Sequence, residues 1–167
     1  MKKLFIVRHA KSSWDYPELD DFDRPLNKRG KRNAPEMGQR LAQRNVKPDL
    51  MISSPAKRAA ATARRIAEQI SFPISRIQKE SLLYHGSTGN MINMIKSVND
   101  SVNILMIFGH NPGLTDLANH LSGSDIYNIP TCGITEIDFD ISSWNDLAAN
   151  EGNLISFDFP KKALPAG

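Results

Sequence analysis

Residues 4–10 read Leu4-Phe5-Ile6-Val7-Arg8-His9-Ala10, and this stretch decides the fold. Its first four residues are apolar and rich in β-forming types, the pattern of a strand buried on both faces. A second apolar run, 102–108, is followed in the same way by Gly109-His110. The sequence therefore predicts two buried strands, each with a histidine at its carboxyl end.

Helices are expected to alternate with strands along the rest of the chain. One helix should run from Lys28 towards Arg44, with Asn27 as its N-cap and with Pro35 either kinking it or marking the start of its main part. Further ranges predict helices over 56–70, 90–98 and 114–121, and strands over 49–53, 133–141 and 153–159. The alternation predicts a three-layer α/β/α sandwich with a mainly parallel central sheet. We expect one domain over residues 1–160 and a short tail over 161–167.

The strand expected over 133–141 differs from the others in its pattern. Ile134, Glu136, Asp138 and Asp140 alternate with Thr135, Ile137, Phe139 and Ile141. Alternation with a period of two is typical of a strand with one solvated face.

The formal net charge of +3 at pH 7 comes from cations that are spread along the chain. Such charges are mostly a solvated surface, and the alternative is a basic site for an anionic substrate. No stripe of cations interleaved with aromatic residues is present, so a nucleic-acid partner is not expected.

The single cysteine, Cys132, opens an apolar segment, which predicts a small buried residue rather than a nucleophile. The apolar run behind Met1 is too short for a secretory signal, and no stretch reaches the length of a membrane span. These features predict a cytoplasmic location.

Parallel strands bring their carboxyl ends to one edge of a sheet, and ligands bind there in α/β folds. That edge would hold Arg8 with His9, then His110, and also Arg58, which follows a third strand by way of Ser54-Pro55. Arginine grips phosphate oxygens in pairs, and neutral imidazole is a good nucleophile for phosphorus. A phosphate site competes here with a metal site and with purely structural roles. The spacings lack a zinc pattern, so no metal is expected.

Three motifs in order resemble the histidine phosphatase superfamily, which has the phosphoglycerate mutase-like fold. They are Arg8-His9-Ala10, Ser54-Pro55-Ala56-Lys57-Arg58-Ala59 with Thr62 one turn on, and Gly109-His110; the segment Leu26-Asn27-Lys28-Arg29-Gly30 adds a fourth similarity. The segments 8–12, 23–26 and 109–112 are similar to the short SixA-type branch, whose members remove phosphate from phosphohistidine in proteins. Ala10 departs from the glycine usual in the wider superfamily.

The resemblance implies a role for each matching residue. His9 would be the phosphorylated nucleophile, Arg8 and Arg58 would clamp phosphate oxygens, and His110 would donate a hydrogen bond to the phosphoryl group. Arg24 would be either a further anion contact or a surface residue. No metal or cofactor is implied.

A general acid is harder to assign, because the region after the second strand is short. Glu80, Tyr84 and His85 are weak candidates, with Tyr84 expected to pack with its hydroxyl in water. The leading hypothesis is a phosphatase acting on phosphohistidine in proteins. The alternatives are a small-molecule phosphomonoesterase with the same mechanism and a non-catalytic module that binds phosphoproteins. The acidic residues Glu18, Asp20, Asp21 and Asp23 would form a solvated loop or recognise a partner.

Overall fold

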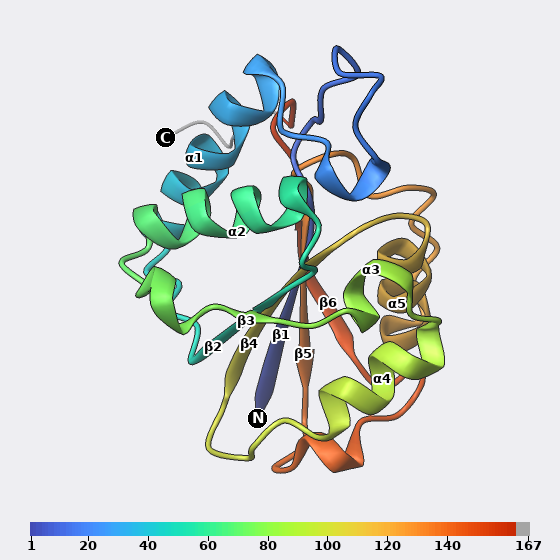
Figure 1. The fold of residues 1–167 in the computed structure, drawn as a ribbon. Helices are drawn as coiled ribbons and strands as arrows, with labels where there is room; N and C mark the ends of the chain where they lie inside the picture. The colour runs from blue at the N-terminus through green and yellow to red at the C-terminus, as the bar shows by residue number, and fades with distance from the viewer. Residues whose placement is uncertain (163–167) are drawn as a thin grey trace.

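A six-stranded sheet forms the centre of the molecule, with strand order β3-β2-β4-β1-β5-β6 (Figure 1). The structure is a computed structural model that describes residues 1–162. The strands are β1 (Lys2–Arg8), β2 (Leu50–Ser53), β3 (Gln78–Lys79), β4 (Ile104–Gly109), β5 (Ile134–Phe139) and β6 (Asn153–Asp158). The helices are α1 (Lys28–Gln43), α2 (Lys57–Gln69), α3 (Leu82–His85), α4 (Thr88–Lys96) and α5 (Gly113–Ser122), with short 3-10 turns η1 (Asp21–Asp23), η2 (Ile74–Arg76) and η3 (Trp144–Asp146).

The sheet is mainly parallel. β3, β2, β4 and β1 all run in the same direction, whereas β5 is antiparallel to β1 and β6 is antiparallel to β5. Helices α1 and α2 cover one face, and α3, α4 and α5 cover the other (Figure 1). The predicted three-layer α/β/α sandwich is confirmed.

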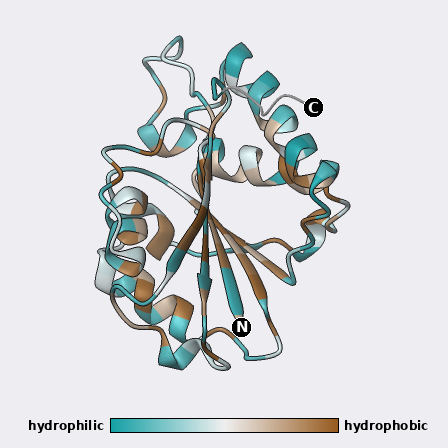
Figure 2. Ribbon diagram, turned by 180° about the vertical axis from the view of Figure 1, so that it is seen from behind, coloured by the Kyte–Doolittle hydropathy of each residue, from teal (hydrophilic) through white to brown (hydrophobic). Residues whose placement is uncertain are grey.

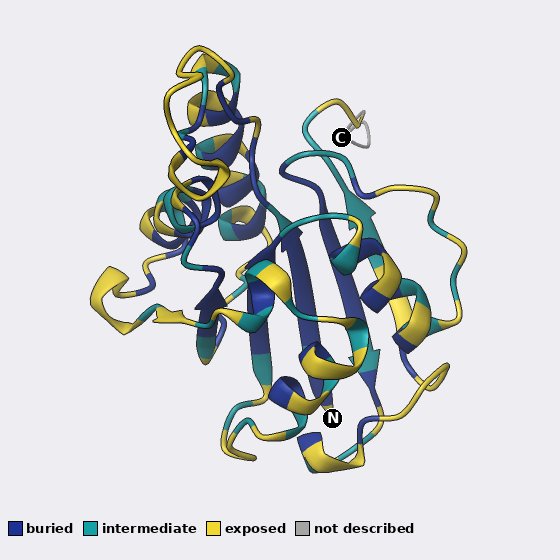
Figure 3. Ribbon diagram, turned by 45° about the vertical axis from the view of Figure 1, so that its right-hand side comes forward, coloured by how far each residue is buried: buried dark blue, intermediate teal, exposed yellow. Residues whose placement is uncertain are grey.

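Two hydrophobic cores lie on opposite faces of the sheet, and β1 contributes to both. Leu4 and Ile6 pack towards α4 and α5, whereas Phe5 and Val7 pack towards α1 and α2, and all four side chains are fully buried. Strands β1, β2, β4 and β5 are buried along most of their length, whereas the edge strands β3 and β6 are exposed or half-buried, and the helices turn polar faces outward (Figures 2 and 3). This double burial is why residues 4–7 are uniformly apolar.

Helix α1 begins as expected, because the Asn27 side chain accepts a hydrogen bond from the backbone N–H of Gly30 (2.8 Å). Pro35 lies inside α1, which continues to Gln43. The alternative in which the main helix starts near Pro35 is therefore wrong.

Strand β5 corrects one prediction, since it has no solvated face. Glu136 is only 3% exposed, because Lys3, Arg44 and Ser156 surround its carboxylate at 2.5 to 2.7 Å. Burial by itself would raise the pKa of Glu136, but the three hydrogen bonds outweigh it and hold the pKa below its ordinary value. The sequence shows an acidic strand face, and the structure covers that face with cations from β1 and the end of α1.

Two remaining features complete the fold. Within residues 1–162, none of the helices combines the length and the apolar character needed to cross a membrane. Of the predicted tail, Lys161 and Lys162 are exposed, and residues 163–167 lie outside the described part of the chain.

The Glu136 cluster generates a stability prediction. Replacing Glu136 with Gln keeps the volume but leaves Lys3 and Arg44 without a buried carboxylate, so the free energy of unfolding should fall by about 2 kcal/mol. Urea unfolding at pH 7 measures this. The control is Glu68→Gln, because the Glu68–Arg64 pair is exposed and 3.9 Å long; that variant should lose less than about 0.5 kcal/mol. Equal small losses in both variants would contradict the assignment.

Candidate active site

His9 and His110 lie together at the carboxyl ends of β1 and β4. The parallel register pairs Arg8 with Gly109, and the backbone N–H of His9 donates to the Gly109 carbonyl (3.1 Å). The two imidazole rings are 5.1 Å apart between centroids. Sheet geometry therefore brings together two histidines that are about a hundred residues apart in the sequence.

His9 is held with one ring nitrogen free. Its Nδ1 lies 2.7 Å from the Ala10 carbonyl oxygen. A carbonyl can only accept, so Nδ1 carries the hydrogen and Nε2 keeps its lone pair. Burial, together with the nearby charges of Arg58, Arg8 and Arg24, lowers the pKa of His9 to about 4 against the opposing effect of the Ala10 carbonyl. His9 is therefore a neutral imidazole at pH 7.

His110 is oriented by Ser54 from the neighbouring strand end. Its Nε2 lies 2.8 Å from Ser54 Oγ, which also accepts from the backbone N–H of Ala56 (3.1 Å). The Ser54 hydroxyl is free to donate its own hydrogen to Nε2, and this tautomer places the imidazole hydrogen on Nδ1. Burial, with the charges of His9 and Arg58, lowers the pKa of His110 to about 3, so this ring is also neutral at pH 7.

The two arginines are each tied to the protein through their terminal nitrogens. Arg8 Nη1 donates to the Ile129 carbonyl (2.9 Å). Arg58 donates to Asp21 twice, through Nη1 to the carbonyl (2.6 Å) and through Nη2 to Oδ2 (3.0 Å). Burial and the neighbouring Arg58 charge lower the pKa of Arg8, as expected for two cations forced close together.

Three buried nitrogen atoms in this group have no hydrogen-bond partner. They are Arg8 Nε, Arg58 Nε and His110 Nδ1, and within residues 1–162 no other buried side-chain nitrogen lacks a partner. Buried polar groups without partners are rare in proteins and often indicate a ligand. An anion with several acceptor oxygens, placed between the two guanidinium groups and His110, would satisfy all three.

Arg24 is buried rather than a surface residue. Its Nε donates to the Ser13 carbonyl (3.1 Å), its Nη1 to Asp21 Oδ1 (3.1 Å) and its Nη2 to Ser12 Oγ. Its guanidinium also stacks over the Trp14 ring, 3.3 Å from the centroid. Arg24 is near enough to His9 to lower its pKa, although most of its donors are already engaged.

Asp21 connects these groups, a role that the sequence did not indicate. Its carboxylate accepts from Arg58, from Arg24 and from the Tyr84 hydroxyl (2.8 Å). Burial opposes ionisation of Asp21, but these three donors prevail and lower its pKa to about 2. Asp21 was expected in a solvated or partner-binding loop, and its side chain is 54% exposed as a solvated loop predicts, while it also pairs with both arginines. Asp21 thus binds both Nη atoms of Arg58, while Arg58 Nε is buried without a hydrogen-bond partner in the described part of the chain.

Of the three candidates for a general acid, Tyr84 and His85 lie together beside His110, and Glu80 lies elsewhere. Tyr84 packs its ring edge to face on that of His110 at 5.2 Å, and its hydroxyl donates to Asp21 at an exposed position, as expected for a packed ring with its hydroxyl in water. His85 packs on Tyr84, with ring centroids 3.9 Å apart. Glu80 accepts from the backbone N–H of Leu82 and lines a different cavity, with Asp49 and Arg76.

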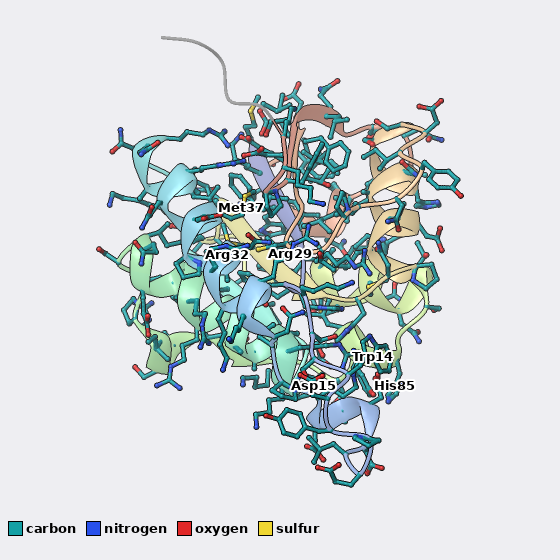
Figure 4. All side chains as sticks on the ribbon, turned by 90° about the horizontal axis from the view of Figure 1, so that it is seen from above. Trp14, Asp15, Arg29, Arg32, Met37 and His85 are labelled. Atoms are coloured by element: carbon teal, nitrogen blue, oxygen red, sulfur yellow. The ribbon has the colours of Figure 1, made fainter. Side chains whose placement is uncertain are left out.

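A cavity of about 320 Å³ adjoins His110, lined in part by Tyr84, His85, Pro112 and Asp116. The segment 11–26 forms the loop drawn in blue at the upper right of Figure 1. Viewed from above, Trp14, Asp15 and His85 lie on the same side of the molecule, whereas Arg29 and Arg32 lie on α1 (Figure 4).

Cys132 has a structural place beside this site. Its thiol is fully buried, and burial raises its pKa to about 12, which confirms the prediction of a buried, unreactive residue. Its backbone N–H donates to the His9 carbonyl (3.0 Å) and so fixes the strand end that carries His9.

One family model, two sequence relatives and one solved structure illustrate which known proteins are similar to this chain. The model of the histidine phosphatase superfamily (branch 1) matches residues 4–91. An uncharacterized chloroplastic protein of Arabidopsis thaliana is 31% identical over 90% of this chain and 72% of its own length. An uncharacterized protein of Mycobacterium tuberculosis is 31% identical over 93% of this chain and its entire length. The crystal structure of the putative phosphohistidine phosphatase SixA from Agrobacterium tumefaciens superposes with a TM-score of 0.82 at 27% identity, covering 95% of this chain and 98% of that one.

The lowered histidine pKa values generate a prediction for stability against pH. Both pKa values are lower in the folded state than the ordinary 6.5, so below about pH 6.5 the unfolded chain binds more protons than the folded one. Stability should therefore fall as pH drops from 7 to 5, by about 1–2 kcal/mol for each buried histidine.

Urea unfolding of the wild type and of His110→Asn at both pH values tests this effect. The variant should lose less stability than the wild type on going to pH 5. His120→Asn is the matched control, because His120 is an exposed histidine on α5, and it should behave as the wild type. The same pH dependence in all three proteins would show that His110 is not held neutral.

Proposed function

This chain belongs to the histidine phosphatase superfamily, and we propose that it is a metal-independent phosphatase that takes the phosphoryl group onto His9 from phosphohistidine in a protein. The superfamily supports phosphatase activity. One observation above all supports phosphorylation of His9. Among residues 1–162, Arg8 Nε, Arg58 Nε and His110 Nδ1 are buried without partners near a neutral His9, where they could bind the oxygens of a phosphoryl group.

The proposed reaction has two displacement steps. His9 Nε2 attacks phosphorus, a P–N bond forms on His9, and the P–N bond of the substrate breaks with its electron pair going to the leaving imidazole, which takes a proton from water. Water then attacks the phosphorus of phosphorylated His9, releases inorganic phosphate and returns the electron pair to Nε2. Arg8 Nε, Arg58 Nε and His110 Nδ1 donate to the phosphoryl oxygens in both steps, where negative charge must be stabilised.

The choice of phosphohistidine follows from what stands near His9 to protonate a leaving group. An alkoxide needs a general acid urgently, whereas imidazole is a far better leaving group. Asp21 has a pKa of about 2 and is ionised. Burial and the hydrogen bond to the Asp21 carboxylate raise the pKa of the Tyr84 hydroxyl above its ordinary value. Glu80 lines a different cavity. His85, which lines the cavity beside His110, is the remaining candidate. With so few acids near His9, the site favours a substrate whose leaving group needs little acid assistance.

A protein substrate is supported by the rim of the site. Trp14, Tyr16, Leu19 and Phe22 are all exposed, at 75%, 48%, 36% and 38%, and all lie on the loop that carries Asp21. Exposed large apolar side chains that cluster on one segment are typical of protein contact surfaces. The SixA structure from Agrobacterium is described as a putative phosphohistidine phosphatase, which agrees with this substrate class.

The cavity of about 320 Å³ beside His110 favours a second candidate, a small-molecule phosphomonoesterase with the same His9 chemistry. Its volume suits a small leaving group. The two candidates differ in which phosphorylated compound is turned over fastest.

A comparison of substrates in the presence of a chelator tests the proposal. Turnover of a histidine-phosphorylated phosphotransfer protein should exceed that of p-nitrophenyl phosphate and of sugar phosphates by about 100-fold or more in kcat/KM, a difference in barrier of about 2.7 kcal/mol. The kcat/KM of His9→Ala should fall about 10³-fold or more, and this variant should form no acid-labile phosphoenzyme. His120→Asn should keep the wild-type kcat/KM and still form the phosphoenzyme. Faster hydrolysis of the esters would support the phosphomonoesterase, and full activity in His9→Ala would exclude the covalent route.

A further inference from the structure

A second cavity, of about 510 Å³, lies along the outer side of α2 and is separate from the one beside His110. Its lining comes from the segment after Arg24, from α1, from α2 and from the η2–β3 segment. We call it the α2 groove, and its lining residues are Pro25, Leu26, Lys31, Lys57, Ala60, Ala61, Arg64, Arg65, Ile74, Ile77 and Lys79.

The α2 groove carries charge of one sign. Five of its lining residues are cations and none is acidic. Among residues 1–162, Lys31, Lys57 and Lys79 form no ion pair, and Arg64 has only a long contact of 3.9 Å with Glu68. Positive charges that line one groove raise the local concentration of anionic partners. The groove therefore favours an acidic ligand.

The lining of the groove indicates what kind of acidic ligand fits. Apolar aliphatic side chains, including Leu26, Ile74 and Ile77, line it together with the cations, and none of its lining residues within 1–162 is aromatic. Proteins that bind single-stranded nucleic acid stack the bases on aromatic side chains. Aliphatic and basic side chains in one groove suit a polypeptide segment with acidic and apolar residues.

The groove starts at the edge of the proposed active site. Lys57 directly precedes Arg58, and Pro25 directly follows Arg24. Lys79 pairs in the sheet with Ser53, the residue before Ser54, which contacts His110. From Lys57 to Arg65 the groove follows α2 for about 12 Å, at 1.5 Å per residue. The groove lining therefore includes the sequence neighbours of Arg58 and Arg24 and the sheet partner of Ser53.

We propose that the α2 groove docks an acidic segment of the phosphoprotein substrate. This inference rests on the proposed function for its biological occupant, but binding of an acidic peptide can be measured without any turnover. Docking away from the phosphoryl group adds affinity for the substrate and leaves the chemical step unchanged. The expected signature is therefore a change in KM with a constant kcat.

The binding experiment uses a fluorescein-labelled 12-residue peptide of alternating glutamate and alanine, followed by fluorescence anisotropy. The wild type should bind it, with affinity falling as salt rises. Lys31→Glu/Arg65→Glu should weaken binding by about tenfold or more. The control, Lys47→Glu/Lys161→Glu, has the same change of charge at exposed positions outside the groove and should bind as the wild type.

Several results would overturn the proposal. The first is that the wild type does not bind the peptide, and the second is that both double variants weaken binding equally. The third is that the wild type binds a single-stranded oligonucleotide of equal charge more tightly than the peptide, and that only the groove variant loses this oligonucleotide binding. The groove variant should hydrolyse p-nitrophenyl phosphate at the wild-type rate, because neither Lys31 nor Arg65 belongs to the proposed active site. With a histidine-phosphorylated protein, its KM should rise about fivefold at constant kcat. Peptide binding without turnover of phosphohistidine would refute the proposed function and leave the groove assignment standing.

Discussion

The parallel pairing of β1 with β4 is the constraint on which the candidate site depends. It sets Arg8 opposite Gly109 and so places His9 and His110 at one sheet edge. Side chains alternate between the faces of a strand, so a slip of one residue would turn His9 to the opposite face. Such a slip would also carry a charged residue, Lys3 or Arg8, into the fully buried stretch that residues 4–7 occupy, and this opposes it. The backbone bonds of His9 to Gly109 and of Cys132 to His9 hold the strand end in place.

Electrostatic interactions at this sheet edge set the protonation states of the candidate site residues. Two buried guanidinium groups repel one another, and the same burial keeps both histidines neutral. The Asp21 carboxylate offsets part of the positive charge while it holds the terminal edge of Arg58. Arg8 Nε, Arg58 Nε and His110 Nδ1 have no partner within residues 1–162, and in the proposed mechanism they would meet the charge that develops on the phosphoryl group.

Local signals in the sequence were enough to predict the alternating strands and helices, the Asn27 cap and the buried Cys132, because each depends on residues close in sequence. The contacts of Asp21 could not be predicted, since Tyr84 and Arg58 lie 63 and 37 residues away and no periodicity links them. The covered face of β5 was missed for a similar reason. Acidic residues in a strand ordinarily indicate a solvated face. Here Lys3 and Arg44, which are distant in sequence, bind the Glu136 carboxylate and allow it to be buried.

A crystal structure with tungstate bound tests the central claim most directly. The account predicts one tungstate at the sheet edge, with tungsten in line with His9 Nε2 and with its oxygens about 2.7–3.1 Å from Arg8 Nε, Arg58 Nε and His110 Nδ1. Tungstate bound elsewhere, with these three nitrogens still lacking an oxygen partner, would contradict it.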